Sequence, residues 1–429
     1  MSDAVRDMTL CRVCGKEDWL DVLSFGPMPL ANNYLAPALS YDGEPRFPMD
    51  VIVCRSCWLM AIRQVVSPDV LYRHYVYISS DSRQILTHMH DVANLAATRF
   101  KLPAGSLVIE LGSNIGTQLE VFRNMGMRVL GVDPARNLAD LANAKGLETL
   151  LEFFGEGLAR TILARYGHPR LILGRHVFAH IDDLTDVIQG AKRLLDPTGL
   201  FAVEVPYLLD LLRGNQFDTI YHEHLSYFSV GTLRRLFERH DLRVVDIARF
   251  AVHGGSIVVF VGQAEGRWPS GQAVCEFEEQ EVRSGLTNEV AYQRFAERSS
   301  RTIRELGALV RRLVGQGNRV AGYGAPAKGN TLLNACGLTA RDLQYVSDTT
   351  EFKQGRVLPG THVPVVSPAY AREHPPDYFL LLPWNYAKEI IGREQPLLQK
   401  GIRFIVPIPE PLVVSKDSLT DATFSLSHG

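Results

Sequence analysis

Short apolar runs alternate with stretches of helical spacing between Ser106 and about residue 263. The early connecting stretches, TQLEVFRNMG and ARNLADLANAKG, have the pattern of amphipathic helices. This alternation predicts a mostly parallel sheet with helices on both faces. The predicted strands are SLVIEL, RVLGVD, RLILGR, GLFAVEV, DLRVVDIARF and SIVVFVG.

A second, shorter alternation runs from about residue 310 to 410. The stretch RVAGYGAPAKGNTLLNAC is typical of a strand, a glycine loop and a helix, and LQYVSD, DYFLLLP and IRFIVPIP are predicted strands. Helices are expected at about 287–315 and about 80–98, the latter with N-cap candidates from Ser80 to Ser82. Residues 264–288 begin as a polar loop and become acidic, and the tail from Ser415 is expected to be disordered.

Two C-x-x-C pairs mark the N-terminal part, Cys11 with Cys14 and Cys54 with Cys57. Each pair can present two thiolates on a tight turn, and two such turns complete a tetrahedral zinc site. Usual zinc ribbons separate the pairs by about 15–20 residues. Here 39 residues intervene, so a proline-rich stretch must be looped out. Four thiolates leave no open position, so the zinc is expected to be structural; free or redox-active thiols are the alternative.

The bulk composition is that of an ordinary globular chain. Its 429 residues are 46% hydrophobic and 21% charged, with a net charge of −2. This length suggests two or three domains. No apolar run reaches the roughly 18–20 residues that span a bilayer, and the N-terminus lacks the features of a secretory signal. We therefore expect a cytoplasmic enzyme with no nucleic-acid or membrane partner.

The loop after the first predicted strand is a candidate cofactor site. In VIELGSNIG, Glu110, Gly112, Asn114 and Gly116 follow the strand, where a glycine-rich turn lets a ligand approach the backbone. Asp133 ends the next strand about 20 residues later, and a carboxylate there can accept hydrogen bonds from a ribose diol. The E-x-G-x-x-x-G form resembles the S-adenosylmethionine loop of class I methyltransferases and lacks the G-x-G-x-x-G of a dinucleotide fold.

Other interpretations of this loop are a nicotinamide site and a structural turn. Phe154, after the third strand region, is expected to flank the adenine or to pack in the core. Together these features predict an α/β chain: a zinc-binding module at 1–75, a class I, Rossmann-like methyltransferase domain at 76–265, a linker and helix at 266–315, and a smaller α/β domain at 316–415.

Several further stretches resemble one family, the sugar C-methyltransferases of deoxysugar biosynthesis. They are PLANNYL, YVYISSDS, FDTIYHEHLSYFS, VHGGS, GYGAPAKGNTLLN, DTTEFKQGRVLPGTHVPV and LPWNYAKEI. The similarity spans about residues 10–410. It implies methylation of carbon 3, or in some members carbon 5, of a nucleotide-linked 4-keto-6-deoxyhexose, here expected to carry dTDP. The chain departs from the family at His176, often asparagine, at His222, often acidic, and in SNIG, usually Asn-Asp-Gly.

The YHEH stretch is the candidate for acid–base chemistry. A 4-keto group makes the neighbouring C3 proton removable, so the enzyme needs a base near that proton and a donor near the enolate oxygen. His224 is the candidate base, because imidazole titrates near neutral pH, and Tyr221 is the candidate donor. The resemblance assigns Tyr221, Glu223 and His224 to the active site and also suggests Tyr77 and His180. Structural roles are the alternative for each histidine, and the H-E-x-x-H spacing of a catalytic metal is absent.

The C-terminal glycine loop is the candidate site for the nucleotide. Backbone N–H groups at the start of its helix, together with Lys328, can receive a diphosphate. The resemblance adds a set of substrate-binding candidates in the same domain: Tyr323, Lys328, Asn330, Asp348, Lys353, Arg356, Trp384 and Asn385. His253-Gly254-Gly255 is either a second place of close ligand approach or a simple turn.

Three other functions stay open at this point. They are O- or N-methylation of another metabolite, a nicotinamide-dependent oxidation, and non-catalytic binding of a nucleotide sugar. The expected partner is a nucleotide-sugar substrate, and the chain is expected to be a monomer or a weak dimer.

Overall fold

The computed structural model describes residues 5–72 and 83–418. These residues fold into two compact units, and the chain passes between them several times. Unit 1 comprises Met1–Asp21, Ile52–Asp210 and Glu223–Glu289, and unit 2 comprises Val22–Val51, Leu211–His222 and Val290–Gly429. Both cysteine pairs therefore belong to unit 1, whereas most of the stretch between them belongs to unit 2.

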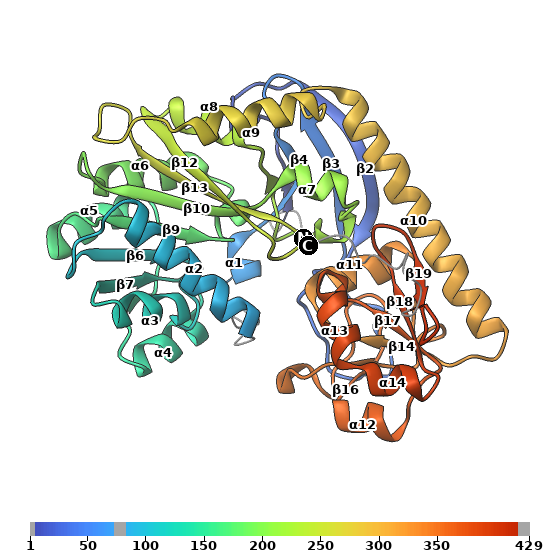
Figure 1. Cartoon of the computed structure of the whole chain (residues 1–429). Helices are drawn as coiled ribbons and strands as arrows, with labels where there is room; N and C mark the ends of the chain where they lie inside the picture. Colours follow the sequence, from blue (N-terminus) through green and yellow to red (C-terminus); the bar gives the residue numbers. More distant parts are fainter. Residues whose placement is uncertain (1–4, 73–82, 419–429) are drawn as a thin grey trace. The chain divides into compact units, whose positions relative to one another are not determined.

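The centre of unit 1 is a seven-stranded sheet (Figure 1). Its strands are β6 (Leu107–Leu111), β7 (Arg128–Val132), β8 (Thr149–Leu150), β9 (Leu171–Arg175), β10 (Leu200–Pro206), β12 (Leu242–Phe250) and β13 (Ser256–Gln263). They lie in the order β12-β13-β10-β9-β6-β7-β8, and β13 is antiparallel to both of its neighbours. Every residue of β6 is buried, which explains its continuous apolar run. The predicted mostly parallel sheet is confirmed.

The strand order reverses beside β6. From β6 the chain moves outward to β7 and β8, and it then returns to place β9 on the other side of β6. In open α/β sheets, ligands bind outside the carboxyl ends of the strands at such a switch point. The Gly112–Gly116 loop follows β6 and the segment 176–180 follows β9, so the topology places both at the ligand-binding end of the sheet.

Helices cover both faces of this sheet (Figure 1). On one face, Ile85 and Met89 of α2 pack in a cluster with Val108 of the sheet. On the other face, Phe237 of α8 packs against Phe201 of β10, with ring centroids 6.1 Å apart. Phe201 points to this face because its neighbours Leu200 and Ala202 belong to the first cluster, and successive strand residues point to opposite faces. The helices are α1 (Pro68–Tyr72), α2 (Arg83–Arg99), α3 (Thr117–Asn124), α4 (Arg136–Ala144), α5 (Glu156–Tyr166), α6 (Leu184–Leu194), α7 (Leu208–Arg213), α8 (Val230–Glu238) and α9 (Gln272–Arg283).

Short strands surround the cysteine pairs. They are β1 (Val5–Asp7), β2 (Trp19–Met28), β3 (Phe47–Cys54), β4 (Met60–Ile62), β5 (Gln64–Val66) and β11 (Ser226–Tyr227). β1 pairs with β5 and β4 pairs with β11, both antiparallel. The sequence did not predict β2 and β3, because most of β2 is only partly buried and shows no period-two alternation.

The core of unit 2 is a six-stranded sheet in the order β16-β15-β14-β17-β18-β19. Its strands are β14 (Val320–Tyr323), β15 (Val346–Ser347), β16 (Val365–Val366), β17 (Tyr378–Leu381), β18 (Arg403–Val406) and β19 (Leu412–Val414). Its helices are α10 (Glu289–Gly315), α11 (Ala327–Ala335), α12 (Pro368–Glu373), α13 (Ala387–Arg393) and α14 (Gln395–Gln399). The strand order reverses beside β14, so this sheet has a switch point of its own, between β14 and β17.

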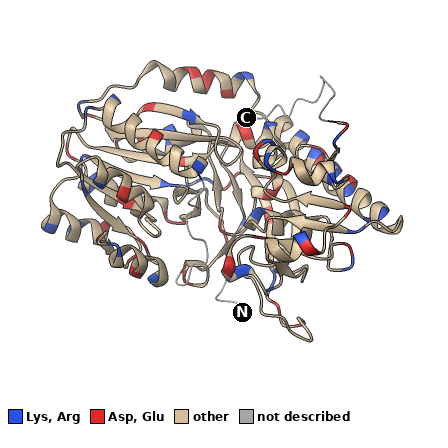
Figure 2. Ribbon diagram, turned by 60° about the horizontal axis from the view of Figure 1, so that its bottom comes forward, with Lys and Arg blue, Asp and Glu red and all other residues tan. Residues whose placement is uncertain are grey.

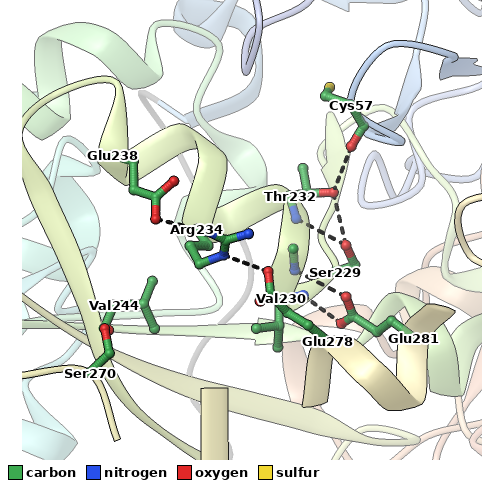
Figure 3. A network of polar contacts seen from close by, with 11 residues as sticks. Cys57, Ser229, Val230, Thr232, Arg234, Glu238, Val244, Ser270, Glu278 and Glu281 are labelled. Carbon is green, nitrogen blue, oxygen red and sulfur yellow. Dashed lines mark hydrogen bonds and ion pairs between the residues drawn. The ribbon is translucent and has the colours of Figure 1, made fainter. Parts of the chain in front are cut away.

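Helix α9 forms from the acidic stretch to which the sequence assigned no structure. Its buried Glu281 accepts hydrogen bonds from the N–H groups of Val230 and Gly231, at 2.6 and 3.0 Å, and from the hydroxyl of Tyr207 at 3.0 Å. Figure 3 shows this carboxylate at the first turn of α8, beside the N-cap Ser229. A negative charge there satisfies free N–H groups and opposes the helix dipole, so Glu281 fastens α9 to α8.

Charged residues of both signs are interspersed along the described part of the chain (Figure 2). Among the described residues, no helix combines the length and the apolar character that crossing a membrane requires.

We expect Glu281→Ala to lower the free energy of unfolding by about 2 kcal/mol, because it leaves two buried N–H groups and a hydroxyl without their acceptor. Thermal and urea denaturation measure this change. Glu279→Ala is the matched control on the same helix, since the Glu279 side chain is 66% exposed in its pair with Arg283. Equal destabilisation by the two variants would contradict the role of Glu281.

Candidate active site

The four cysteines of the two pairs converge in unit 1. Their sulfur atoms all lie within 4.8 Å of one another, with Cys11 Sγ 3.4 Å from Cys57 Sγ and Cys14 Sγ 3.5 Å from Cys54 Sγ. A zinc tetrahedron with Zn–S bonds of about 2.3 Å has sulfur–sulfur edges of about 3.8 Å. The cluster therefore fits Zn²⁺. Because all four positions of the tetrahedron are filled by protein sulfur, the zinc is structural.

The thiols of this cluster perturb one another. The hydrogen bond with Cys57 lowers the pKa of Cys11, and burial raises the pKa of Cys54. Four adjacent thiols cannot all ionise without a compensating cation. A bound Zn²⁺ supplies that charge and keeps each sulfur as a thiolate.

The loop after β6 has the geometry expected of a donor-binding turn. Gly112 and Gly116 have φ values of 63° and 77°, and Asn114 has 53°, all in the left-handed region that glycine adopts readily. The carboxylate of Asp133 holds this loop, because Oδ2 accepts the N–H of Asn114 at 2.8 Å and Oδ1 accepts that of Ala135 at 2.9 Å. Asp133 thus links the loop after β6 to the segment after β7.

Glu110 supplies the clearest sign of a missing ligand in this loop. It is buried, and its Oε2 has no hydrogen-bond partner among the described residues. Burial raises its pKa to about 8, although Arg175 opposes the shift. A buried carboxyl with an unused acceptor atom just before a glycine turn, with Asp133 after the next strand, fits S-adenosylmethionine. Phe154 is half-buried after β8, and its contact with an adenine stays a prediction.

Two imidazoles lie together in the same unit. The ring centroids of His180 and His224 are 4.9 Å apart. Tyr72 Oη lies 3.3 Å from Nδ1 of His180 and donates to the carbonyl of Glu223 at 3.2 Å. Burial, with His224 and His176 nearby, lowers the pKa of His180 well below its ordinary value. His180 is therefore a neutral imidazole, which is the form that accepts a proton.

The segment that carries His180 packs against the donor loop. A Cβ atom on Gly112 would lie 2.9 Å from Cγ2 of Val177, so glycine is required for the two loops to approach. His180 follows Val177 by one turn of a 3₁₀ helix, Phe178–His180. The two loops that flank the switch point, the donor loop and the loop that carries His180, are thus in direct contact.

A buried charge cluster lies where β9 and β10 end. Glu204 is fully buried and accepts from Nε of Arg175 at 2.7 Å, and its other oxygen lies 2.6 Å from Nε2 of His88. Burial alone would raise its pKa, but Arg175 and His176 hold it well below the ordinary value. His176 packs edge-on against His253 at 4.8 Å. Glu204 therefore stays ionised and organises the residues at this edge.

The glycine turn at Gly254–Gly255 is explained by packing. A Cβ atom on Gly255 would lie 2.3 Å from Oδ2 of Asp210, and that carboxylate also accepts from Nε of Arg249 at 3.1 Å. Close approach of a protein side chain, without any ligand, thus accounts for the glycine at 255.

In unit 2, three of the predicted substrate residues converge at the β14/β17 switch point. Nζ of Lys328 lies 4.2 Å from the ring centroid of Trp384 and donates to Oδ1 of Asn385. Asp218 joins them, accepting from Nε1 of Trp384 at 2.6 Å, while its Oδ1 has no partner among the described residues. Burial lowers the pKa of Lys328 and raises that of Asp218. A half-buried lysine beside a buried carboxylate oxygen that has no partner among the described residues makes this cluster a candidate polar ligand site.

Two further predicted residues hold the glycine loop itself. Asp348 accepts the N–H of Ala325 at 2.6 Å, and Lys353 donates to the carbonyl of Ala325 at 2.8 Å. That carbonyl also accepts from the hydroxyl of Tyr34 at 2.6 Å. Asp348 and Lys353 thus fix the backbone that follows β14.

The remaining predicted residues of unit 2 bind other parts of the protein. Asn330 donates to the carbonyl of Ala31 at 2.7 Å, and Arg356 donates to that of Tyr34 at 3.2 Å. Tyr323 donates to Glu394 at 2.6 Å. These contacts are within the protein, and the binding of substrate by these three residues stays a prediction.

The rest of the YHEH stretch divides between the units. Tyr221 is half-buried in unit 2, and its role stays a prediction. His222 is 1% exposed and lies with Nε2 3.1 Å from the carbonyl of Pro48, which is a structural environment. Tyr77 lies outside the described residues.

Sequence reasoning missed four residues of these clusters: Tyr72, His88, Glu204 and Asp218. Glu204 had a signal, since it is an acidic residue inside the apolar run GLFAVEV and buried charges are almost always paired. Asp218 had a weaker one, its place in FDTIYHEH. Tyr72 and His88 had none, because their partners are 108 and 116 residues away.

A doubly wound sheet with this donor loop at its switch point defines an S-adenosylmethionine-dependent methyltransferase, here with a zinc-binding module. Three family models match successive parts of the chain: a zinc binding domain over residues 11–72, a methyltransferase domain over 77–247 and a C-methyltransferase C-terminal domain over 251–409. The C-methyltransferase NovU of Streptomyces niveus is 52% identical over 418 residues, covering 97% of this chain and 100% of the relative. The chain belongs to this family of C-methyltransferases.

Solved structures of other methyltransferases match more distantly. Magnesium protoporphyrin IX methyltransferase of Synechocystis with bound SAH has 14% identity and a TM-score of 0.32, covering 42% of this chain and 82% of that one. The CcbJ methyltransferase of Streptomyces caelestis has 15% identity and a TM-score of 0.33, covering 41% and 89%. Neither match is extensive enough to bear on the substrate.

We expect Asp133→Asn to weaken S-adenosylmethionine binding by about tenfold or more, since a hydrogen bond to a charged group contributes about 1.5–3 kcal/mol. The amide also places a donor against the N–H of Asn114 or Ala135. Isothermal titration calorimetry measures the affinity. Asp140→Asn is the control, because Asp140 is exposed on α4. Equal affinity of both variants would exclude Asp133 from donor binding.

Proposed function

We propose that this enzyme methylates carbon 3 of a nucleotide-linked 4-keto-6-deoxyhexose, with dTDP as the expected nucleotide. The observation that carries the proposal is the imidazole pair His180–His224, whose ring centroids are 4.9 Å apart; the segment of His180 packs against the donor loop. Transfer of a methyl group to oxygen or nitrogen needs little activation of the acceptor. A carbon acid must first lose a proton to a base, and this pair supports such a role.

His224 is the proposed base that removes the C3 proton. Its neighbour His180 is held by Tyr72, whose hydroxyl donates to the carbonyl of Glu223. Nδ1 of His180 must then carry the proton that bonds to the Tyr72 oxygen. This leaves Nε2 of His180 as an acceptor, so His180 can orient the ring of His224 or take part in moving the proton.

The developing enolate needs a donor at its oxygen. Tyr221 is the proposed donor, and Glu223 is proposed to bind a sugar hydroxyl or to orient a histidine. Tyr77 is proposed as a further active-site residue on the strength of the YVYISS motif. S-adenosylmethionine supplies the electrophilic methyl group. Gly112, Asn114, Gly116, Glu110 and Asp133 would hold it with the methyl directed at the nucleophilic carbon.

The nucleotide is proposed to bind in unit 2 at the β14/β17 switch point. Burial lowers the pKa of the Lys328 side chain. An anionic ligand beside it would raise this pKa again, because a nearby negative charge stabilises the ammonium form. The N–H groups of Ala327 and Lys328, in the first turn of α11, are proposed to bind phosphate oxygens, as helix N-termini commonly do. Trp384 and Asn385 would position the lysine.

The test of this proposal is a methyl-transfer assay. The enzyme is incubated with S-adenosylmethionine and a panel of dTDP-4-keto-6-deoxyhexoses, and we expect a product heavier by one methylene in mass spectrometry. A substrate deuterated at C3 is expected to lose its label as it is methylated. Methylation with full retention of the label would indicate O-methylation, and no product across the panel would contradict the substrate class.

We expect His224→Ala to lower kcat by about a hundredfold or more, the contribution of a positioned base, while donor binding by calorimetry stays unchanged. His240→Ala is the control, because His240 lies beyond the end of α8 and its Nδ1 is 3.1 Å from Nε2 of Gln189. Turnover by His224→Ala at the wild-type rate would remove His224 from the mechanism.

A further inference from the structure

We call the turns Cys11–Cys14 and Cys54–Cys57 the first and the second zinc knuckle. The first knuckle contains an arginine with a buried side chain. Arg12 lies between Cys11 and Cys14, and its side chain is only 4% exposed. A zinc knuckle does not itself require a cation at this position, and a buried guanidinium is costly unless it is paired and hydrogen-bonded. The partners of Arg12 therefore indicate what it does.

Arg12 binds two segments that are distant in the sequence. Its Nε and Nη2 each lie 2.9 Å from Oδ1 of Asp182, and its Nη1 donates to the carbonyl of Leu225 at 3.3 Å. Asp182 is two residues after His180, and Leu225 directly follows His224. The guanidinium thus joins the two segments that carry the imidazole pair.

Other contacts fix the same two segments in the same place. The N–H of Leu225 donates to the carbonyl of Ala179 at 2.9 Å. The N–H of Ile62 donates to the carbonyl of Leu225 at 3.2 Å, and β4 and β11 pair next to it. β4 begins three residues after Cys57, so the second knuckle supports this strand pair.

The second knuckle is also fastened to α8. The hydroxyl of Thr232 donates to the carbonyl of Cys57 at 3.3 Å, and it also lies 2.9 Å from the hydroxyl of the N-cap residue Ser229 (Figure 3). Arg235 donates to the carbonyl of Ser56 at 2.9 Å. The second knuckle is thus held against α8, in the unit that also contains the imidazole pair.

We propose that Arg12 is a positioning residue for the reaction, and that the zinc module acts through it to set the distance and orientation of His180 and His224. This inference rests on the proposed function, in which His224 removes a proton. A misplacement of about 1 Å in a catalytic group can cost about a hundredfold in rate, so a fixed frame around the imidazole pair has a kinetic consequence. The planar guanidinium suits this role, since it can bind a carboxylate and a carbonyl at the same time.

The experiment compares Arg12→Gln, Arg12→Lys and Arg6→Gln in the zinc-loaded full chain. Arg6 is the matched control, because it pairs with the same Asp182 carboxylate but its side chain is 62% exposed and no contact with Leu225 is described for it. Zinc content, donor affinity, kcat and KM are measured for each variant. Histidine ring signals in ¹H–¹⁵N NMR spectra report the imidazole pair without any substrate.

We expect Arg12→Gln to keep its zinc and its donor affinity, to lower kcat by about ten- to a hundredfold with little change in KM, and to shift the ring signals of His180 and His224. Arg12→Lys should restore part of the rate, since it retains the charge toward Asp182. Arg6→Gln should resemble the wild type. If Arg12→Gln does not fold, Asp182→Asn is judged by the same signals and rates.

Wild-type ring signals and wild-type kcat in folded Arg12→Gln would overturn the inference, as would equal effects of Arg6→Gln. Loss of zinc together with loss of rate would also overturn it, because the arginine would then serve the metal site alone. The NMR result separates the two proposals. If the wild type methylates no keto sugar but Arg12→Gln still shifts the ring signals of His180 and His224, the positioning role of Arg12 stands and the proposed substrate is contradicted.

Discussion

The reversal of strand order beside β6 is the constraint on which the rest of unit 1 depends. It places the loops after β6 and β9 next to each other, and the contact between Gly112 and Val177 shows how closely they pack. A side chain at 112 would separate them. The strand order therefore places the cofactor turn next to the loop that carries His180. The side chains on these two loops then determine the chemistry. Unit 2 has a similar arrangement at β14 and β17, with Lys328 in the first turn of α11 after β14 and Trp384 in the 3₁₀ helix after β17.

Buried charges hold these loops in place. Glu204 is compensated by Arg175 and lies within hydrogen-bond distance of His88, and Asp133 is satisfied by two backbone N–H groups. Such groups are costly to bury alone and rigid when fully paired. A site that must hold a base, a carbon acid and a methyl donor in one geometry gains from this rigidity. The zinc cluster extends the same frame, because its sulfur atoms fix both knuckles in a region whose strands are short.

Much of this could be predicted from the sequence. Parallel strands buried on both faces appear as continuous apolar runs, so the central sheet was evident, and the cysteine spacing indicated the metal site. Strand β2 was missed because most of its residues are only partly buried and show no regular alternation, and β3 was missed although its last four residues are all buried. The role of Arg12 could not be predicted for a different reason: its partners, Asp182 and Leu225, are 170 and 213 residues away in the sequence. Contacts of that kind are created by folding and leave no local pattern.

The interleaving of the two units has a consequence for how the protein is made. The segment Val22–Val51 belongs to unit 2, and its Ala31 carbonyl is bound by Asn330, which is 299 residues further along the chain. At about 5–20 residues per second on the ribosome, the early segment waits on the order of 15–60 s for the sheet that receives it. Since each unit is made of three segments that alternate along the chain, no single cut yields both units intact.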